Sequence, residues 1–149
     1  MSELQTATPR DGVAGVDLER AHAVAADLRS YLESGVAPPG LFTDDTFCDF
    51  TFPLGRVQAQ GRQAVLALRQ RGHPVPGTLP RWRVDATALG FVLEFEERWQ
   101  QDGQSWYCRE MLRADLRGRA ICELSVYCTG DWDERRQAQQ RDSGPLIRP

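Results

Sequence analysis

The sequence predicts an α+β protein in which a strongly curved antiparallel sheet packs against helices from the N-terminal half. The N-terminal part of the sequence has the periodicity of a helix, because apolar residues recur at three- and four-residue steps between residues 18 and 32. The second half differs: three strand-like runs follow each other from residue 90 to residue 129, with polar and apolar side chains alternating. The turns between these runs are too short for crossover helices, which excludes a doubly wound parallel sheet.

Most elements carry a start or stop signal. Asp17 is a suitable N-cap for the first helix, and Gly35 is placed to end it. The remaining elements that we expect are a short helical turn at 41–45, a strand at 46–52, an amphipathic helix at 61–71, a Pro/Gly loop at 72–80, strands at 81–89, 91–100, 105–115 and 119–129, and a polar helix at 132–141. We divide the chain into a disordered segment at 1–15, one folded domain at 16–133, and a C-terminal helix or tail at 134–149.

The composition excludes several classes of function. The 149 residues carry a net charge of −3, all positive charge comes from arginine, and there is no basic cluster, so we expect no nucleic-acid partner. Lysine is absent, which excludes Schiff-base chemistry. No apolar run reaches membrane length and there is no signal-peptide pattern at the N-terminus, so we expect a cytoplasmic protein with no membrane partner.

The four cysteines, Cys48, Cys108, Cys122 and Cys128, lie inside strand-like apolar runs and form no CxxC pair. We interpret them as buried small side chains and expect neither a zinc site nor another metal or cofactor.

Two glutamates break the alternation of the last strands. Sorting each run by parity places almost every apolar residue on one face, and Glu97 and Glu110 fall on that same face. Pairing the runs through their turns predicts that Glu110 lies between Leu93 and Leu124, and that Glu97 lies next to Trp106. A carboxyl group with aliphatic neighbours has a raised pKa, so Glu110 is our first candidate for a general acid or base.

Each candidate also has a plainer structural interpretation. Glu110 could be hydrogen-bonded to a helix end or a buried arginine, and Glu97 could be a residue at the rim of a pocket. His73, in the Pro/Gly loop, is either a surface residue or a mobile acid/base on a lid. Asp49 is expected to make structural hydrogen bonds. The candidates for contact with a substrate are His73 and eight residues that could instead belong to the core, namely Tyr31, Phe50, Phe52, Leu93, Phe95, Trp99, Trp106 and Leu124.

The order of elements resembles the nuclear transport factor 2-like superfamily, which includes ketosteroid isomerases, limonene epoxide hydrolases and SnoaL-type polyketide cyclases. The likeness covers residues 18 to 133 and rests on the long first helix, on Pro53-Leu54-Gly55 with Gly61-Arg62 after it, and on the ending Tyr127-Cys128-Thr129-Gly130-Asp131-Trp132. The run from Glu97-Arg98-Trp99 to Arg109-Glu110 is also similar to an uncharacterised actinobacterial group. The resemblance implies a cone of curved sheet with an internal pocket, and a homodimer across the outer face of the sheet.

The chemistry of these relatives fits only in part. The resemblance places Glu110 at or near the acid that donates to the oxyanion in ketosteroid isomerases, but Phe52 stands where those enzymes have their catalytic aspartate. No Asp-Arg-Asp set of the epoxide hydrolase kind is visible.

Three functions therefore stay open. The first is a cofactor-free enzyme that catalyses isomerisation, cyclisation, dehydration or hydrolysis of a small hydrophobic molecule, for example in secondary metabolism. It would use Glu110 as acid or base, together with Glu97 or His73. The second is a protein that binds such a molecule without catalysis. The third is a dimeric interaction domain whose pocket is filled by its own side chains.

Overall fold

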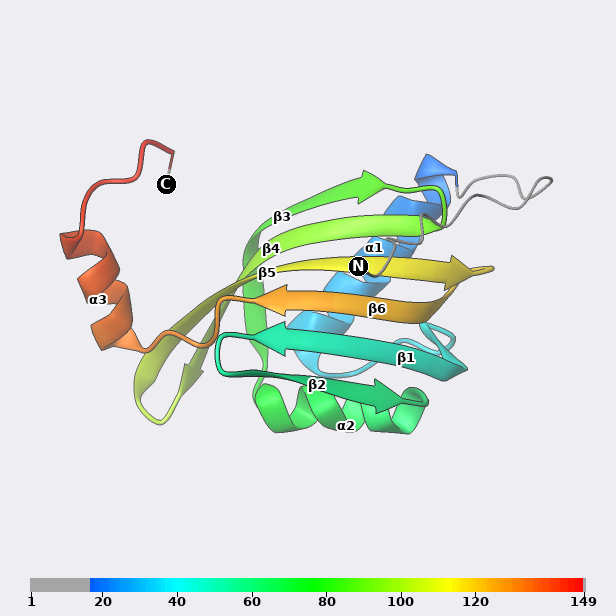
Figure 1. Ribbon diagram of the computed structural model, residues 1–149, viewed down its shortest axis with the longest axis horizontal. Coiled ribbons are helices and arrows are strands. Elements are labelled where there is room, and N and C mark those ends of the chain that lie inside the picture. The colour runs from blue at the N-terminus through cyan, green and yellow to red at the C-terminus, as the bar shows by residue number, and fades with distance from the viewer. Residues whose placement is uncertain (1–16, 149) are drawn as a thin grey trace, which may run out of the picture.

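The computed structural model describes residues 17–148, which form three helices and one six-stranded sheet (Figure 1). The predicted disordered segment at 1–15 lies outside the described residues. In chain order the elements are α1 (Leu18–Ser34), β1 (Phe42–Phe52), β2 (Gly55–Gln60), α2 (Arg62–Gly72), β3 (Gly77–Ala86), β4 (Gly90–Gln101), β5 (Gln104–Arg117), β6 (Ala120–Cys128) and α3 (Glu134–Asp142). This composition confirms the predicted α+β class.

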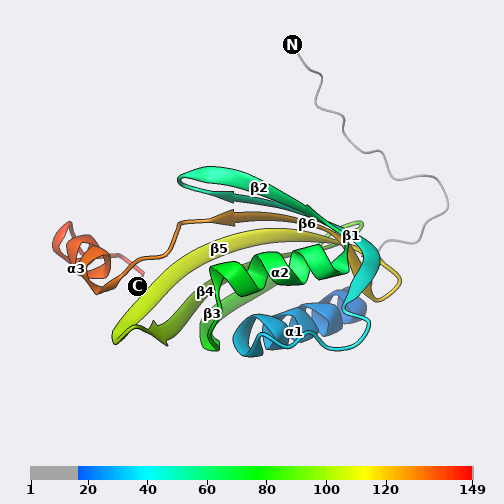
Figure 2. The same cartoon turned by 90° about the horizontal axis from the view of Figure 1, so that it is seen from below.

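The sheet is curved, and both long helices lie on its concave side (Figure 2). Its strand order is β2-β1-β6-β5-β4-β3. All neighbouring strands are antiparallel except β1 and β6, which run parallel, so the expectation of a wholly antiparallel sheet was wrong at this one pair. Helix α3 stands beyond the end of the sheet rather than under it (Figures 1 and 2). Among residues 17–148, no helix is both long and apolar enough to cross a membrane.

Helix α1 follows its sequence signals. The Asp17 side chain accepts a hydrogen bond of 2.6 Å from the Arg20 backbone N–H, which satisfies a donor that the first turn leaves free. Gly35 has φ 76° and donates its N–H to the Tyr31 carbonyl at 2.8 Å, an ending that needs a left-handed residue. The stripe that faces the sheet is buried and consists of Ala21, Val24, Ala25, Leu28, Tyr31 and Leu32.

Alternation along β4, β5 and β6 places the core as the sequence predicts. Leu93, Phe95, Cys108 and Ala114 are at most 1% exposed on the concave face, and their sequence neighbours point outward. The pairing itself differs from the prediction. Glu110 lies opposite Phe95 and Cys128, not between Leu93 and Leu124.

The position of Glu97 also differs, because it lies opposite Cys108 rather than beside Trp106. The β4–β5 hairpin closes through Asp102 and Gly103, which both have positive φ, and a β-bulge between Asp115 and Leu116 shifts the β5–β6 pairing. Both errors are even numbers of residues, which is why Glu97 and Glu110 keep their predicted face.

Three segments were predicted wrongly in the first half. Residues 41–45 are not a helical turn, because β1 already begins at Phe42 and the Leu41 carbonyl accepts a hydrogen bond of 2.8 Å from the Ile121 N–H. Strand β2 was missed, since its sequence GRVQAQ is mostly exposed at a sheet edge. Strand β3 starts at Gly77, inside the predicted loop, because an edge strand tolerates Pro80 at a shift in register.

The convex face carries paired charges. Arg109 contacts Glu94 at 2.7 Å, and Arg113 pairs with Asp115 and Glu123. Asp49 accepts hydrogen bonds from Arg56 and Gln58 on this face, in agreement with its structural interpretation. The homodimer across this surface stays a prediction.

The assignment of side chains to the two faces of the sheet predicts different stability losses for alanine substitutions on the concave and convex faces. Leu93→Ala should lower the free energy of unfolding by about 2–5 kcal/mol, because the side chain is fully buried. Met111→Ala should change it by less than about 0.5 kcal/mol, since this side chain is 48% exposed on the outer face. Denaturant unfolding of both variants measures the difference, and similar costs would contradict the assignment.

Candidate active site

A cavity of about 670 Å³ lies between the concave face of the sheet and the two long helices. Its floor consists of buried residues from α1, the strands and α2, namely Leu28, Tyr31, Leu32, Phe42, Cys48, Val65, Glu110, Leu112, Leu124 and Val126. Its mouth is marked by lining residues that are exposed, namely Pro53, Leu54, Val57, Arg71, Gly72, Thr129, Asp131 and Arg136. The volume is in the range of sites that hold a drug-sized molecule.

An ion pair crosses from α2 to the sheet beside this cavity. Arg69 reaches Glu97 on β4 with both terminal nitrogens: Nη1 lies 3.1 Å from Oε2, and Nη2 contacts Oε1. The same Nη2 donates to the Leu32 carbonyl at 2.8 Å, near the end of α1. Glu97 is 1% exposed, and the Arg69 side chain is 13% exposed. A charge this deeply buried needs its partner, because the protein interior solvates it poorly.

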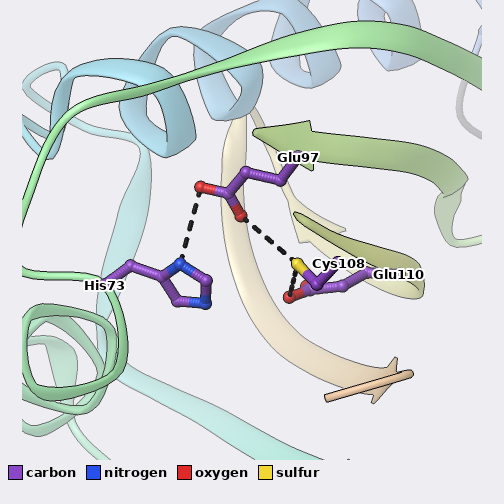
Figure 3. A group of neighbouring side chains, drawn as sticks. All are labelled: His73, Glu97, Cys108 and Glu110. Carbon is purple, nitrogen blue, oxygen red and sulfur yellow. Dashed lines mark hydrogen bonds and ion pairs between the residues drawn. The ribbon is translucent and has the colours of Figure 1, made fainter. Parts of the chain in front are cut away.

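Glu110 contributes the one carboxyl group among the floor residues. Its Oε1 lies 3.7 Å from the Cys108 thiol (Figure 3). Its neighbours on the sheet are Phe95 and Cys128. Burial raises the pKa of Glu110 to about 7, the negative charge of Glu97 adds to the rise, and the Arg69 cation opposes it. Glu110 can therefore hold or release a proton near neutral pH.

His73 is brought to the same place by the helix before it. Val65, Arg69 and His73 are spaced by four residues, which puts them on one face, and the His73 N–H caps α2 by donating to the Arg69 carbonyl at 2.8 Å. Its Nδ1 lies 3.7 Å from Glu97 (Figure 3). Its Nε2 lies 3.8 Å from Asp131. The side chain is only 9% exposed and packs edge-on against Trp99, so the interpretation as a surface residue was wrong.

The charge state of His73 follows from its surroundings. Burial lowers the pKa of His73 to about 4, the Arg69 cation lowers it further, and Glu97 opposes the shift only in part. The imidazole is neutral at physiological pH. Burial also raises the pKa of Asp131 above its usual range.

Histidine, thiol and carboxylate groups lie close enough together here to be considered as metal ligands. Donor atoms of His73, Glu97, Cys108 and Glu110 all lie within 4.8 Å of one another, as do those of Cys108, Cys128 and Asp131. However, Arg69 already occupies both oxygens of Glu97, so the protein supplies the cation that this carboxylate needs. The Cys128 thiol together with burial raises the pKa of Cys108, the thiol that both groups share, so this thiol is protonated while no cation lies beside it. We assign no metal to the cluster.

The structure brings together about half of the residues that the sequence analysis selected. Six of them line the cavity: Tyr31, Phe50, Phe52, His73, Glu110 and Leu124. Five lie outside the lining, in the core or at the end of the sheet beyond it: Leu93, Phe95, Glu97, Trp99 and Trp106. Glu97 is not at a rim, because it lies behind Arg69 with 1% of its surface exposed.

Two residues of the site were missed. Arg69 looks like one more arginine on a polar helix, and only its four-residue spacing from Val65 and His73 could have placed it on the buried face. Asp131 follows β6 in a turn and reaches the site because Gly130, at φ 79°, redirects the chain.

No protein-family profile and no curated protein matches the sequence of this chain. Solved structures do match. An NTF2-like protein of Anabaena variabilis superposes with a TM-score of 0.62 at 21% identity, over 76% of this chain and 90% of that one. A protein of Xanthomonas campestris that is provisionally named a polyketide cyclase gives 0.60 at 17%, over 73% and 90%. A phenazine biosynthesis-related protein of Pseudomonas aeruginosa gives 0.57 at 13%, over 93% and 94%.

These likenesses establish the fold, which is the nuclear transport factor 2-like cone that the resemblance implies. The similarity to an actinobacterial group stays a prediction.

The buried ion pair predicts a non-additive effect on stability. Arg69→Met should lower the free energy of unfolding by about 3–5 kcal/mol, because it leaves Glu97 charged and buried without a partner. Adding Glu97→Gln should recover a large part of that loss, since a neutral amide costs less to bury. Denaturant unfolding of the single and double variants measures the coupling. Strict additivity would show that the two side chains do not depend on each other.

The raised pKa of Glu110 predicts a pH-dependent stability with a definite sign. A folded-state pKa of about 7, against 4.5 for the free group, means that the folded protein binds more protons between these values. This contribution is fully present below about pH 4.5 and is lost as the pH rises through 7. Glu110→Gln should therefore become more stable relative to the parent by about 3 kcal/mol between pH 4.5 and 8. Urea unfolding of Glu110→Gln and the parent across this range tests it, and a stability difference that does not change with pH would contradict it.

Proposed function

We propose that the cavity binds a small, mainly apolar metabolite and that Glu110 transfers a proton to or from it. The observation that carries the proposal is a carboxyl group with a pKa of about 7 on the floor of an apolar cavity of about 670 Å³. A general acid or base works best when its pKa lies near the working pH, because both protonation states are then accessible. The reaction class is isomerisation, cyclisation, dehydration or hydrolysis without a cofactor.

Other residues act on Glu110 or on the ligand. Arg69 limits the rise in the Glu110 pKa, and Glu97, the partner of Arg69, holds the guanidinium in place. Tyr31 lines the cavity, and burial raises its pKa, so its hydroxyl is a neutral hydrogen-bond donor at physiological pH. His73 is neutral and offers a lone pair to the same space.

The rate enhancement that one general acid or base can give favours a reaction with a low barrier. One positioned acid/base contributes roughly 10²–10⁴-fold to a rate. Enolisation of a carbonyl compound, the first step of many isomerisations and cyclisations, needs little more than this together with a hydrogen bond to the developing oxyanion. The provisional name of the Xanthomonas protein, a polyketide cyclase, agrees with this reaction class.

A second candidate is a binding protein without catalysis. Burial lowers the pKa of His73 to about 4, so His73 is a weak partner for Glu110 in a reaction that needs an acid and a separate base. Glu110 would then only fix the polar end of the ligand. The open cavity gives no support to an interaction domain whose pocket is filled.

Proton exchange on a simple ketone distinguishes these roles. The protein should accelerate deuterium uptake at the carbon next to the carbonyl of α-tetralone in heavy water, because Glu110 can remove and return that proton. Glu110→Gln should lower the protein-dependent rate by about 10²–10⁴-fold. Mass spectrometry of the ketone measures the uptake.

The control for this assay is Glu123→Gln, which removes an exposed carboxylate from the outer face of β6 and should exchange normally. Saturable binding of the ketone without any exchange would favour the binding protein. Normal exchange by Glu110→Gln would refute the acid/base role.

A further inference from the structure

The mouth of the cavity holds two arginines that lack counter-charges. Arg71 is in the last turn of α2, Arg136 is in the first turn of α3, and both are exposed residues of the lining. Among residues 17–148, neither guanidinium forms an ion pair, whereas arginines on the outer surface such as Arg56, Arg109 and Arg117 do.

The guanidinium of Arg136 is held in place without being neutralised. Its central carbon lies 4.8 Å from the centre of the Trp132 ring, and Trp132 also lines the cavity. Stacking on an aromatic face leaves the in-plane N–H groups of an arginine free to donate. These N–H groups match the two oxygens of a carboxylate.

The charges deeper in the cavity do not cancel this positive mouth. Arg69 and Glu97 neutralise each other in their ion pair. Burial raises the pKa of Glu110 to about 7, so this carboxyl group is only partly charged near neutral pH. At the mouth, Asp131 is the one carboxylate among the exposed lining residues, against two arginines. The cavity is therefore positive at its entrance, although the chain as a whole has a net charge of −3.

Apolar surface lies beside these cations. Leu54, at the tip of the β1–β2 hairpin, lines the cavity and is 95% exposed, and Val57 lines it with 37% exposure. An exposed apolar side chain at the edge of an apolar cavity extends the surface that a ligand can cover. A fitting ligand has an apolar body and an anionic end.

We propose that the ligand is an amphipathic carboxylic acid, with its carboxylate held at the mouth by Arg71 and Arg136 and its apolar body inside the cavity. The inference deepens the proposed function and rests on the same cavity, but it does not require Glu110 to be catalytic. It also sets the orientation of the ligand: the carbon that meets Glu110 belongs to the end far from the carboxylate.

Two probes that share one chain and differ in the head group test the proposal. Decanoate should bind the full-length protein at least about tenfold more tightly than decanol, as measured by isothermal titration calorimetry below the micellar concentration. Arg71→Gln and Arg136→Gln should each weaken decanoate by roughly 3- to 10-fold and leave decanol unchanged, because each removes one charged contact. Added salt should weaken decanoate selectively.

Arg135→Gln is the matched control, since Arg135 is adjacent on α3 but does not line the cavity. Equal binding of the two probes, equal loss of both in the mouth variants, the same loss in Arg135→Gln, or no saturable binding of decanoate would each overturn the proposal. The thermal midpoint of each variant confirms that it is folded. Selective decanoate binding by a protein that shows no α-tetralone exchange would remove the catalytic role and leave this inference standing.

Discussion

The pair between Arg69 and Glu97 is the interaction on which the arrangement of the site depends. It joins α2 to β4, and its hydrogen bond to the Leu32 carbonyl also brings in the end of α1. Three elements that are distant in the sequence thus meet at one guanidinium. The attraction between two buried charges offsets their desolvation cost only when their geometry is good. The two contacts between Arg69 and Glu97 therefore constrain how α2 lies on the sheet. That placement in turn positions His73 at the end of the same helix.

The same pair controls the protons around it. Glu110 and His73 are both desolvated by the cavity walls, and this shifts their pKa values in opposite directions, towards the neutral form of each. The Arg69 cation works against the shift in Glu110 and with the shift in His73. The result is a floor that carries little net charge and one acid poised near neutrality. Charge that can attract a ligand is displaced to the mouth, where Arg71 and Arg136 face solvent.

The sequence allowed the fold class and the faces of the sheet to be predicted, because both depend on local periodicity. Glu97 and Glu110 were placed correctly on the concave face, since an even error in register leaves side-chain direction unchanged. The exact neighbours of these glutamates were not predictable, because they depend on a two-residue turn and a β-bulge that have weak sequence signals. Strand β2 was missed for a related reason: at an exposed edge, composition says little about pairing.

Arg69 and Asp131 illustrate a different limit. Their roles come from the meeting of α2, β4 and the turn after β6, and no local pattern records which distant elements meet. One of the two interpretations of His73 placed it on the surface, because Pro74, Pro76 and Gly77 follow it and resemble a loop. The helix before it, rather than the loop after it, determines its burial. Conversely, Trp99 and Trp106 were good candidates by residue type, but they stack on each other at the end of the β4–β5 hairpin beyond the cavity.

The parallel contact between β1 and β6 has a consequence for how the protein is made. Strand β6 fills a central position between β1 and β5, yet within residues 17–148 it is the last strand in sequence order. Until β6 is available, the β1–β2 hairpin and the β3–β4–β5 meander cannot become part of one sheet, and each exposes an unpaired strand edge. Pairing across so large a sequence separation is slow, because the intervening chain must be ordered first. The sheet can therefore be completed only after β6 has been added, and until then its unpaired edges expose the chain to aggregation.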